Sequence, residues 1–370
     1  MAPAKLTDDP ELSPDLPTKW PYIEFNGEPP ASDRAALFIT FCATSPDGQL
    51  LASVTTTIQI IVWRLSDGLS VQRLGDHGHE KAIRSLAFSP DGRFIASGSA
   101  DATGIIWNIE TGLAVLHLKG HRDAVEKVAY TADGLRIITA SQDSSVKFWD
   151  AESGAPLCNF PIGEEIQGLV LSPEGSRLAV WMKRSVTLYD VEPGKPIVQL
   201  GSLEPPHSAK VLTVAFTPGA NHVFISDSDG SGRIFSTDSC KQLTELERLP
   251  SKIVSAAFSP DGNHLATVAL HHSLIFWNPR SGALRSQRDI GLSGAAVAFS
   301  PNGKFIAAAG GDEGHVRVWT EESEEFIADF TVPGSQVHEI RFLSDSRQLL
   351  TFSKEGPVCL WNIANVLRVR

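Results

Sequence analysis

The chain has 370 residues, with 32 Lys and Arg against 43 Asp and Glu, so its formal net charge is −11 at pH 7. This charge disfavours non-specific binding to nucleic acid or anionic lipid, which requires a cationic surface. Hydrophobic residues make up 42% of the chain, which is enough for a large core, and there is no apolar run of the ~18 residues that would indicate a transmembrane helix.

Residues 1–19 are acidic and rich in proline, which predicts a flexible tail rather than a signal peptide. The apolar segment 20–25 follows this tail. The four cysteines are far apart and form no Cys-x-x-Cys pair, so we expect neither a disulfide framework nor a zinc site of the usual spacing. Because the chain also has no Asn-x-Ser/Thr glycosylation signal, we expect an intracellular protein, in the cytoplasm or the nucleus.

A turn signal of the type Ser-Pro-Asp-Gly recurs through the rest of the chain. Proline suits the first central position of a tight turn, and glycine tolerates a positive φ. An aromatic residue follows each copy at a nearly constant distance. The eight copies begin at Ser45, Ser89, Thr131, Ser172, Thr217, Ser259, Ser300 and Leu343, and the aromatic residues are Trp63, Trp107, Trp149, Tyr189, Phe235, Trp277, Trp319 and Trp361. Two signals that stay in phase over eight copies indicate a repeat architecture.

Each repeat contains four short apolar runs, which in the second repeat are residues 83–88, 94–97, 104–108 and 114–118. Runs of this length that are rich in β-branched and aromatic residues and bounded by turn residues predict strands. Four strands in about 43 residues predict one blade of a β-propeller, and a single blade cannot bury both of its faces alone. We therefore predict an all-β propeller of eight four-stranded blades, formed by residues 20–370 as one domain.

The repeat resembles the WD40-repeat family over residues 20–370. The resemblance rests on the two fullest repeats, each of which has a His, a Ser or Thr, an Asp and a Trp at matching positions. It implies that these side chains form a hydrogen-bonded structural tetrad in each repeat, because a buried Trp N–H and a buried Asp both need partners. The residues are His79, Ser97, Asp101 and Trp107 in one repeat, and His121, Thr139, Asp143 and Trp149 in the next.

The resemblance also implies that an N-terminal strand closes the ring by joining the last blade. Residues 20–25 are the candidate for this strand. The alternative is that residues 366–369 form the outer strand of the last blade themselves. Closure matters because an open ring exposes strand edges.

No enzyme motif is present: we find no dinucleotide-binding glycine motif, no phosphate-binding loop, no zinc-protease motif and no Gly-x-Ser-x-Gly elbow. We therefore expect a non-catalytic protein–protein interaction scaffold with no cofactor and no metal. We expect it to be a monomeric ring within a larger complex, whose partners are proteins rather than nucleic acid or membrane.

The resemblance places the partner-binding residues on the top rim of the ring, where each first strand begins. We expect Phe38, Leu212 and Val254 to present apolar side chains to water. We expect Arg84, Lys210 and Lys252 to anchor carboxylates of a partner. The candidates are Phe38, Thr40, Arg84, Glu126, Glu165, Gln167, Lys210, Leu212, Lys252, Val254, Gln336 and His338.

Two other functions remain open. An arc of histidines on the top face, with Glu126 or Glu165 opposite, would suit an enzyme or a binder of metal or a small ligand in the central funnel. Residues 274–280 approximate the Trp-Asp-x-Arg box of substrate receptors of cullin-type ubiquitin ligases, with Asn278 in place of the Asp and Arg280 as the arginine. The histidines are His271, His272, His315 and His338.

Overall fold

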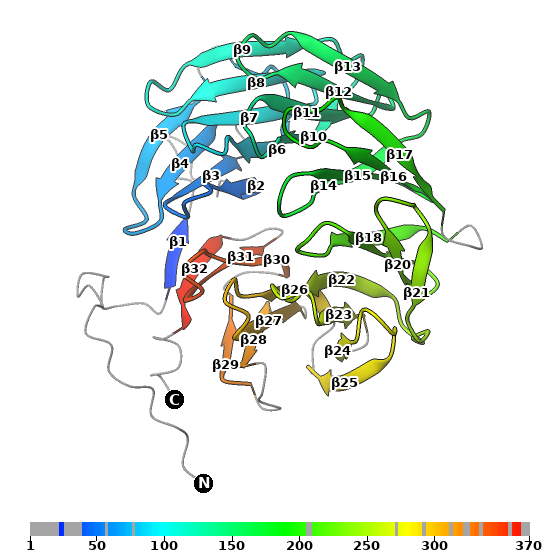
Figure 1. Ribbon diagram of the computed structural model, residues 1–370. Coiled ribbons are helices and arrows are strands. Elements are labelled where there is room, and N and C mark those ends of the chain that lie inside the picture. The colour runs from blue at the N-terminus through cyan, green and yellow to red at the C-terminus, as the bar shows by residue number, and fades with distance from the viewer. Residues whose placement is uncertain are drawn as a thin grey trace.

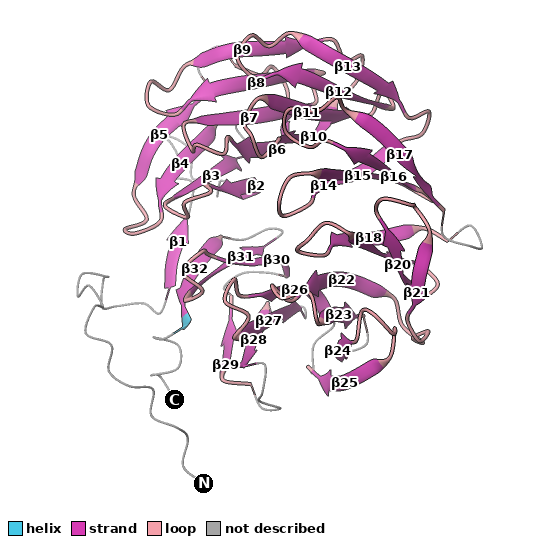
Figure 2. Cartoon of the chain, viewed as in Figure 1, coloured by secondary structure: helices cyan, strands magenta, loops and turns pink. Residues whose placement is uncertain are grey.

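Four-stranded antiparallel sheets, arranged as the blades of a ring, make up most of the described part of the chain (Figure 1). The computed structural model describes residues 22–25, 39–55, 58–75, 78–204, 209–270, 273–290, 294–310, 314–320, 326–332, 336–353 and 357–363. Within these ranges, 32 strands form eight sheets, and short turns and connections join them (Figure 2). The predicted all-β, eight-bladed propeller is therefore confirmed.

Each blade runs from an inner strand at the centre of the ring to an outer strand at its edge (Figure 1). The inner strands are β2 (Ile39–Thr44), β6 (Ile83–Phe88), β10 (Val125–Tyr130), β14 (Ile166–Leu171), β18 (Val211–Phe216), β22 (Ile253–Phe258), β26 (Gly294–Phe299) and β30 (Val337–Phe342). The second strands are β3 (Leu50–Thr55), β7 (Phe94–Ser99), β11 (Arg136–Ser141), β15 (Arg177–Met182), β19 (His222–Asp227), β23 (Leu265–Ala269), β27 (Phe305–Gly310) and β31 (Gln348–Ser353).

The third strands are β4 (Ile60–Arg64), β8 (Thr103–Asn108), β12 (Ser145–Asp150), β16 (Val186–Asp190), β20 (Gly232–Ser236), β24 (Ser273–Trp277), β28 (His315–Thr320) and β32 (Val358–Asn362). The outer strands are β5 (Ser70–Leu74), β9 (Ala114–Lys119), β13 (Pro156–Pro161), β17 (Val198–Leu203), β21 (Gln242–Glu245), β25 (Leu284–Asp289), β29 (Ala328–Thr331) and, in blade 8, β1 (Tyr22–Phe25). Blades are numbered from β2, so blade 1 contains β2–β5. We call the face that carries the connections between blades and the turns between second and third strands the top face, and the opposite face the bottom face.

The recurring Ser-Pro-Asp-Gly signal forms the turn between the first and second strands of a blade. In blade 2, the Ser89 hydroxyl donates to Asp91 at 2.5 Å and accepts from the backbone N–H of Phe94 at 2.9 Å. Gly92 has φ +71°, a left-handed conformation that costs glycine little. The side-chain bonds satisfy backbone groups that a bare turn would leave unpaired, which is why this sequence repeats in phase with the fold.

Apolar packing between neighbouring blades supplies the core. Eight clusters of buried side chains occur in the described part of the chain, one at each junction between blades. At the junction of blades 8 and 1, for example, Leu51 and Trp63 pack with Leu350 and Leu360. The ring is thus continuous through the join between the two ends of the repeat array.

An N-terminal strand completes blade 8. β1 pairs antiparallel with β32 through four residues, from Tyr22 opposite Trp361 to Phe25 opposite Val358. This confirms closure by the segment that the sequence favoured. Residues 1–19 and the alternative segment 366–369 lie outside the described residues, so the expectation of a flexible tail stays a prediction.

We expect removal of residues 1–25 to destabilise the ring, because β32 would lose its ladder to β1. A net contribution of about 0.5–1.5 kcal/mol for each hydrogen bond suggests a loss of about 2–4 kcal/mol of unfolding free energy. The exposed edge of β32 should also promote association between molecules. Urea unfolding and light scattering measure the two effects. Removal of residues 1–19 is the control, and an equal loss in both truncations would contradict the assignment of closure to β1.

Candidate interaction site

A chain of hydrogen bonds links the top of blade 2 to its buried tryptophan. Trp107 Nε1 lies 2.8 Å from Ser97 Oγ, Ser97 Oγ lies 2.8 Å from His79 Nε2, and His79 Nδ1 lies 2.9 Å from Asp101 Oδ2. Because an ionised carboxylate only accepts, Nδ1 carries the proton and Nε2 accepts from the Ser97 hydroxyl. Asp101 also accepts from the backbone N–H groups of Glu80 and Thr103. The carboxylate therefore joins two loops of the top face.

Blade 3 repeats this arrangement with Thr139 in place of the serine. Thr139 Oγ1 lies 2.8 Å from Trp149 Nε1 and 2.7 Å from His121 Nε2, and His121 Nδ1 lies 2.9 Å from Asp143. Burial raises the pKa of Asp143, but hydrogen bonds from Ser145, Arg122 and His121 outweigh burial and lower it to about 2. Burial lowers the pKa of His121. The pair is therefore a carboxylate and a neutral imidazole at neutral pH.

Other blades keep only part of this network. In blades 1, 6 and 8 the tryptophan N–H still donates to a Ser or Thr hydroxyl, at 2.8, 2.8 and 3.0 Å. Blade 5 instead buries an ion pair between Arg233 and Asp227, at 2.5 Å. In blade 4, Tyr189 replaces the tryptophan, and its buried hydroxyl has no hydrogen-bond partner among the described residues. Packing between blades holds the ring where the network is incomplete.

Every inner strand contains a β-bulge at its second residue. The ladder between first and second strands shifts register there in all eight blades. A bulged residue is left unpaired and its side chain is redirected. This geometry was not foreseen from the sequence. The bulged residues are Thr40, Arg84, Glu126, Gln167, Leu212, Val254, Ala295 and His338, seven of which are among the predicted rim residues.

The predicted rim residues differ in exposure. Glu126, Leu212 and Val254 are half-buried, and Val254 packs against the apolar cluster between blades 6 and 7. Leu212 and Val254 are therefore less exposed than expected, and their part in binding a partner stays a prediction. Phe38 lies outside the described residues, and only the backbone of Thr40 is described. The exposed members are Arg84, Glu165, Gln167, Lys210, Lys252, Gln336 and His338.

Arg84 is balanced by an acid of the next blade. Its guanidinium lies 3.8 Å from Glu126, which also accepts a hydrogen bond from Gln142 at 2.9 Å. The arginine is 44% exposed, so this pair is screened by solvent and contributes little to stability. It does reduce the positive charge that blade 2 offers to a partner.

A cationic arc crosses the top face of blades 4 to 6. It consists of Lys183, Arg184, Lys210 and Lys252, all of which are exposed. None of the four forms an ion pair with another described residue. The backbone N–H of Val211 donates to the Lys183 carbonyl at 2.9 Å, so blades 4 and 5 bring their lysines together. The sequence signal was available, since Lys183 and Arg184 follow β15 in a turn that faces the top.

The histidine arc is only partly described, because His271 and His272 lie outside the described residues. His315 is the first residue of β28 rather than part of the preceding turn, and its ring lies 3.6 Å from Asp329. His338 is exposed. Among the residues that the structure describes, no group of three or more His, Cys, Asp or Glu side chains is placed to hold a metal ion.

The segment with Asn278 and Arg280 forms the turn between the third and fourth strands of blade 6, on the bottom face. The Asn278 side chain accepts from the backbone N–H of Arg280 at 2.9 Å. Asn108 and Asp150 accept from the backbone in the corresponding turns of blades 2 and 3. The asparagine thus has the turn-forming role that is common to these blades.

Comparison with known proteins agrees with this architecture. A family model described as the first β-propeller of IFT122 matches residues 108–362, and a model of the WD40 domain of anaphase-promoting complex subunit 4 matches residues 41–132. The first match covers more than half of the chain, which therefore belongs to the WD40-type β-propeller family. A computationally designed protein, Ika8, has a solved structure with a TM-score of 0.71, 21% sequence identity, and coverage of 88% of this chain and 96% of its own. That likeness shows the fold alone.

Several curated proteins are similar over part of the chain. The LST8 homolog of Drosophila melanogaster is 24% identical over 53% of this chain and 65% of its own length. The U3 small nucleolar RNA-associated protein 18 homolog of Mus musculus is 27% identical over 43% of this chain and 30% of its own. The small ribosomal subunit protein RACK1y of Oryza sativa is 25% identical over 43% and 49%. Each match spans less than two-thirds of the relative.

No helix in the described ranges is both long enough and apolar enough to cross a bilayer.

We expect Thr139→Val to destabilise the protein more than Thr267→Val. The first substitution removes the partner of both Trp149 and His121, whereas the second removes the partner of Trp277 alone. An unsatisfied buried polar group costs about 1–3 kcal/mol, so we expect losses of about 2–6 kcal/mol for the first substitution and about 1–3 kcal/mol for the second. Urea unfolding measures both. Equal losses would mean that the histidine adds nothing to the network.

Acidification should weaken the two complete networks. Burial lowers the pKa of His79 and His121, whereas in the unfolded chain they titrate near about 6.5. Below that pH the unfolded chain binds more protons than the folded one, so the free energy of unfolding falls as pH drops from about 7.5 to about 5.5.

The measurement is urea unfolding across this pH range for the wild type and for His79→Gln/His121→Gln. We expect a shallower pH dependence in the double variant, because glutamine does not titrate. The other histidines act as an internal reference, since they are common to both proteins. Parallel curves would refute the assignment.

Proposed function

We propose that the protein is a non-catalytic scaffold that binds other proteins through the top rim of its propeller. The observation that carries the proposal is the bulge at the second residue of every inner strand. The bulge frees that residue from the ladder, and the exposed members of the set lie where the strands open onto the top face.

The cationic arc gives this surface a preferred partner chemistry. Four exposed cations without a described ionic partner, on a chain of net charge −11, offer a local attraction to an acidic segment. Complementary charge raises association rates and selects among partners more than it adds affinity. The arc therefore suits an acidic protein segment better than a nucleic acid or an anionic membrane, which the net charge repels.

The relatives' names are consistent with assembly into larger complexes. One is associated with U3 small nucleolar RNA and another belongs to the small ribosomal subunit. By analogy, we propose that this chain acts as one member of a complex whose other members are proteins.

Reversing charge in the arc should release the partner. We expect Lys210→Glu/Lys252→Glu to weaken binding at least tenfold, about 1.4 kcal/mol or more, and we expect wild-type binding to weaken as ionic strength rises. The measurement is affinity purification of the tagged protein from its own cells, with quantitative mass spectrometry of what is retained. Lys241→Glu/Lys304→Glu is the matched control, because it makes the same charge change at exposed positions on the bottom face.

A partner lost equally from both double variants would argue against the top rim. Recovery of the wild-type protein with no stoichiometric partner would contradict the scaffold itself.

A further inference from the structure

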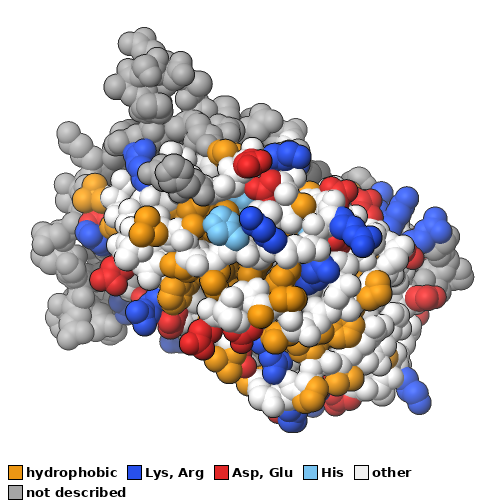
Figure 3. Space-filling model, turned by 90° about the horizontal axis from the view of Figure 1, so that it is seen from above, with side chains coloured by type: hydrophobic (Ala, Val, Ile, Leu, Met, Phe, Trp, Pro, Cys, Tyr) orange, Lys and Arg blue, Asp and Glu red, His pale blue; other side chains and the backbone are white. Residues whose placement is uncertain are grey.

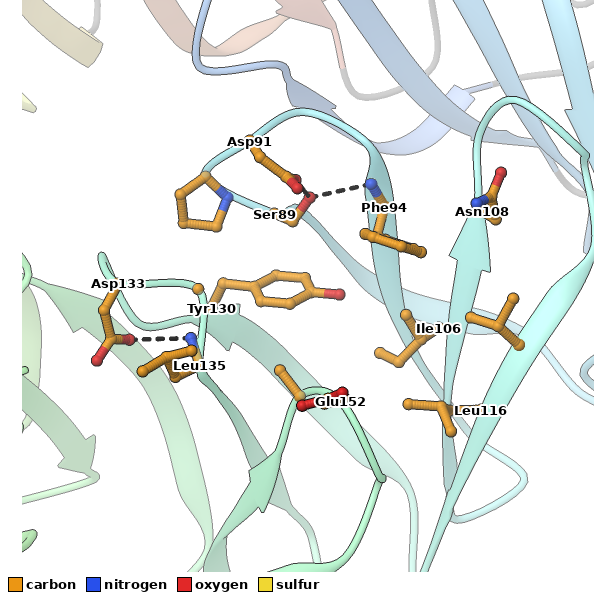
Figure 4. A pocket seen from close by; sticks show the side chains of 14 residues that line it. Ser89, Asp91, Phe94, Ile106, Asn108, Leu116, Tyr130, Asp133, Leu135 and Glu152 are labelled. Carbon is orange, nitrogen blue, oxygen red and sulfur yellow. Dashed lines mark hydrogen bonds between the residues drawn. The ribbon is translucent and has the colours of Figure 1, made fainter. Parts of the chain in front are cut away.

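The junction of blades 2 and 3 is open at its outer end on the bottom face. A groove of about 870 Å³ lies there, lined by the turn that contains Asp91, by Phe94 and Leu116 of blade 2, and by Tyr130 and Leu135 of blade 3. Figure 4 shows Tyr130 extending from blade 3 toward Phe94 and Ile106 of blade 2. Figure 3, which views the molecule from the side of β9 and β13, shows hydrophobic side chains gathered across this edge.

Among the described residues, blades 2 and 3 lack the bonds that join two other pairs of blades at this level. Gln72 of blade 1 donates to the Glu110 carbonyl of blade 2 at 3.4 Å, and Thr244 of blade 5 donates to the Arg280 carbonyl of blade 6 at 3.2 Å. The corresponding residue of blade 2 is Leu116, which has no donor.

A second contact between neighbouring blades, made by an arginine at the start of the second strand, is also missing at this junction. Arg136 of blade 3 donates to the Lys195 carbonyl of blade 4 at 2.7 Å, and Arg177 of blade 4 pairs with Asp238 of blade 5 at 2.9 Å. At the same position blade 2 has Phe94. Among the residues that line the groove, no hydrogen bond or ion pair crosses from one blade to the other.

Apolar surface is left exposed at the rim of the groove. Leu135 is 63% exposed and Val115 is 46% exposed, while Ile106 and Tyr130 form its buried floor. Burial raises the pKa of the Tyr130 hydroxyl, which therefore stays protonated and can both donate and accept. The hydroxyl makes no hydrogen bond to a described residue.

Charge distinguishes this groove from the corresponding one between blades 5 and 6. The lining of the first contains Asp91, Asp133 and Glu152 and no cation. The second groove is about 440 Å³. There Gly219 stands in place of Asp91, Thr244 in place of Leu116 and Arg280 in place of Glu152, while Asp261 keeps the acid found at Asp133. The wider groove is therefore both more apolar and more acidic.

We propose that the groove between blades 2 and 3 is a second docking site, which takes a segment of a partner protein carrying large apolar side chains beside Lys or Arg. The apolar side chains would cover Phe94, Leu116 and Leu135, and the basic ones would meet the three carboxylates at the rim. The site lies on the face opposite the cationic arc, so it is independent of binding at the top rim.

The test is selection of a displayed library of random 12-residue peptides on the full-length protein. Each round is preceded by depletion on Leu116→Thr/Glu152→Arg, which introduces the residues of the groove between blades 5 and 6. We expect the recovered peptides to combine Leu or aromatic residues with Lys or Arg. Their binding, measured by fluorescence polarisation, should be at least tenfold weaker on the depletion variant and should weaken as salt concentration rises.

Three further variants separate this site from other effects. Thr244→Leu/Arg280→Glu makes the reverse exchange in the other groove, and Lys210→Glu/Lys252→Glu alters the top rim; neither should change peptide affinity. Leu135→Asn alters an exposed wall of the groove without changing the core. It should therefore weaken peptide binding without loss of stability, which separates loss of the site from any unfolding of the depletion variant.

Absence of any peptide that survives depletion would overturn the proposal, as would recovery of acidic peptides only. Peptide binding unaffected by Leu135→Asn would also overturn it. Self-association of the wild type that Leu135→Asn abolishes would show that the groove takes a second copy of this chain instead. Lys210→Glu/Lys252→Glu tests only the top rim, and Leu135→Asn tests only this groove. The two proposals can therefore fail separately.

Discussion

Packing between blades is the constraint on which the rest of the structure depends. Each sheet has two apolar faces, and neither can be buried within its own blade. The eight junction clusters solve this problem only if the ring returns to its start, which the cluster between blades 8 and 1 achieves. The pairing of β1 with β32 follows from the same need, because it fills the outer edge of the last blade with backbone from the other end of the chain.

The ring does not depend on a complete hydrogen-bonded network in every blade. Only blades 2 and 3 carry the complete set of four side chains among the described residues, yet the ring includes blades that lack it. What the complete network adds is local order on the top face. Asp101 and Asp143 each accept backbone N–H groups from the loop before the first strand and from the first residue of the third strand. These two blades should therefore hold their rim residues more rigidly than the others.

The fold could be predicted from the sequence because its turn chemistry repeats in phase with its strands. The Ser-Pro-Asp-Gly turn and the tryptophan are local signals, and each marks a fixed point of the blade. The bulges could not be predicted in this way, since no residue type is common to the eight bulged positions. Val254 shows the consequence. Alignment of the repeats predicts that it lies exposed on the rim, but its side chain packs partly against the apolar cluster between blades 6 and 7. The groove was missed for a different reason: it depends on Leu116 and Tyr130, which belong to different repeats, and on bonds that are absent.

The eight repeats of this chain differ from one another most where closure of the ring does not restrict the side chains. The inner strands and the junction clusters must fit their neighbours, whereas the rim and the outer ends of the junctions meet solvent. On the top face this freedom yields a cationic arc over blades 4 to 6, and on the bottom face it yields an acidic, apolar groove between blades 2 and 3. Surfaces of opposite charge on opposite faces of a rigid ring can attract different partners without competing for one site. In the function proposed above, the repeat supplies a common frame for the blades, and departures from the repeat supply the two proposed binding surfaces.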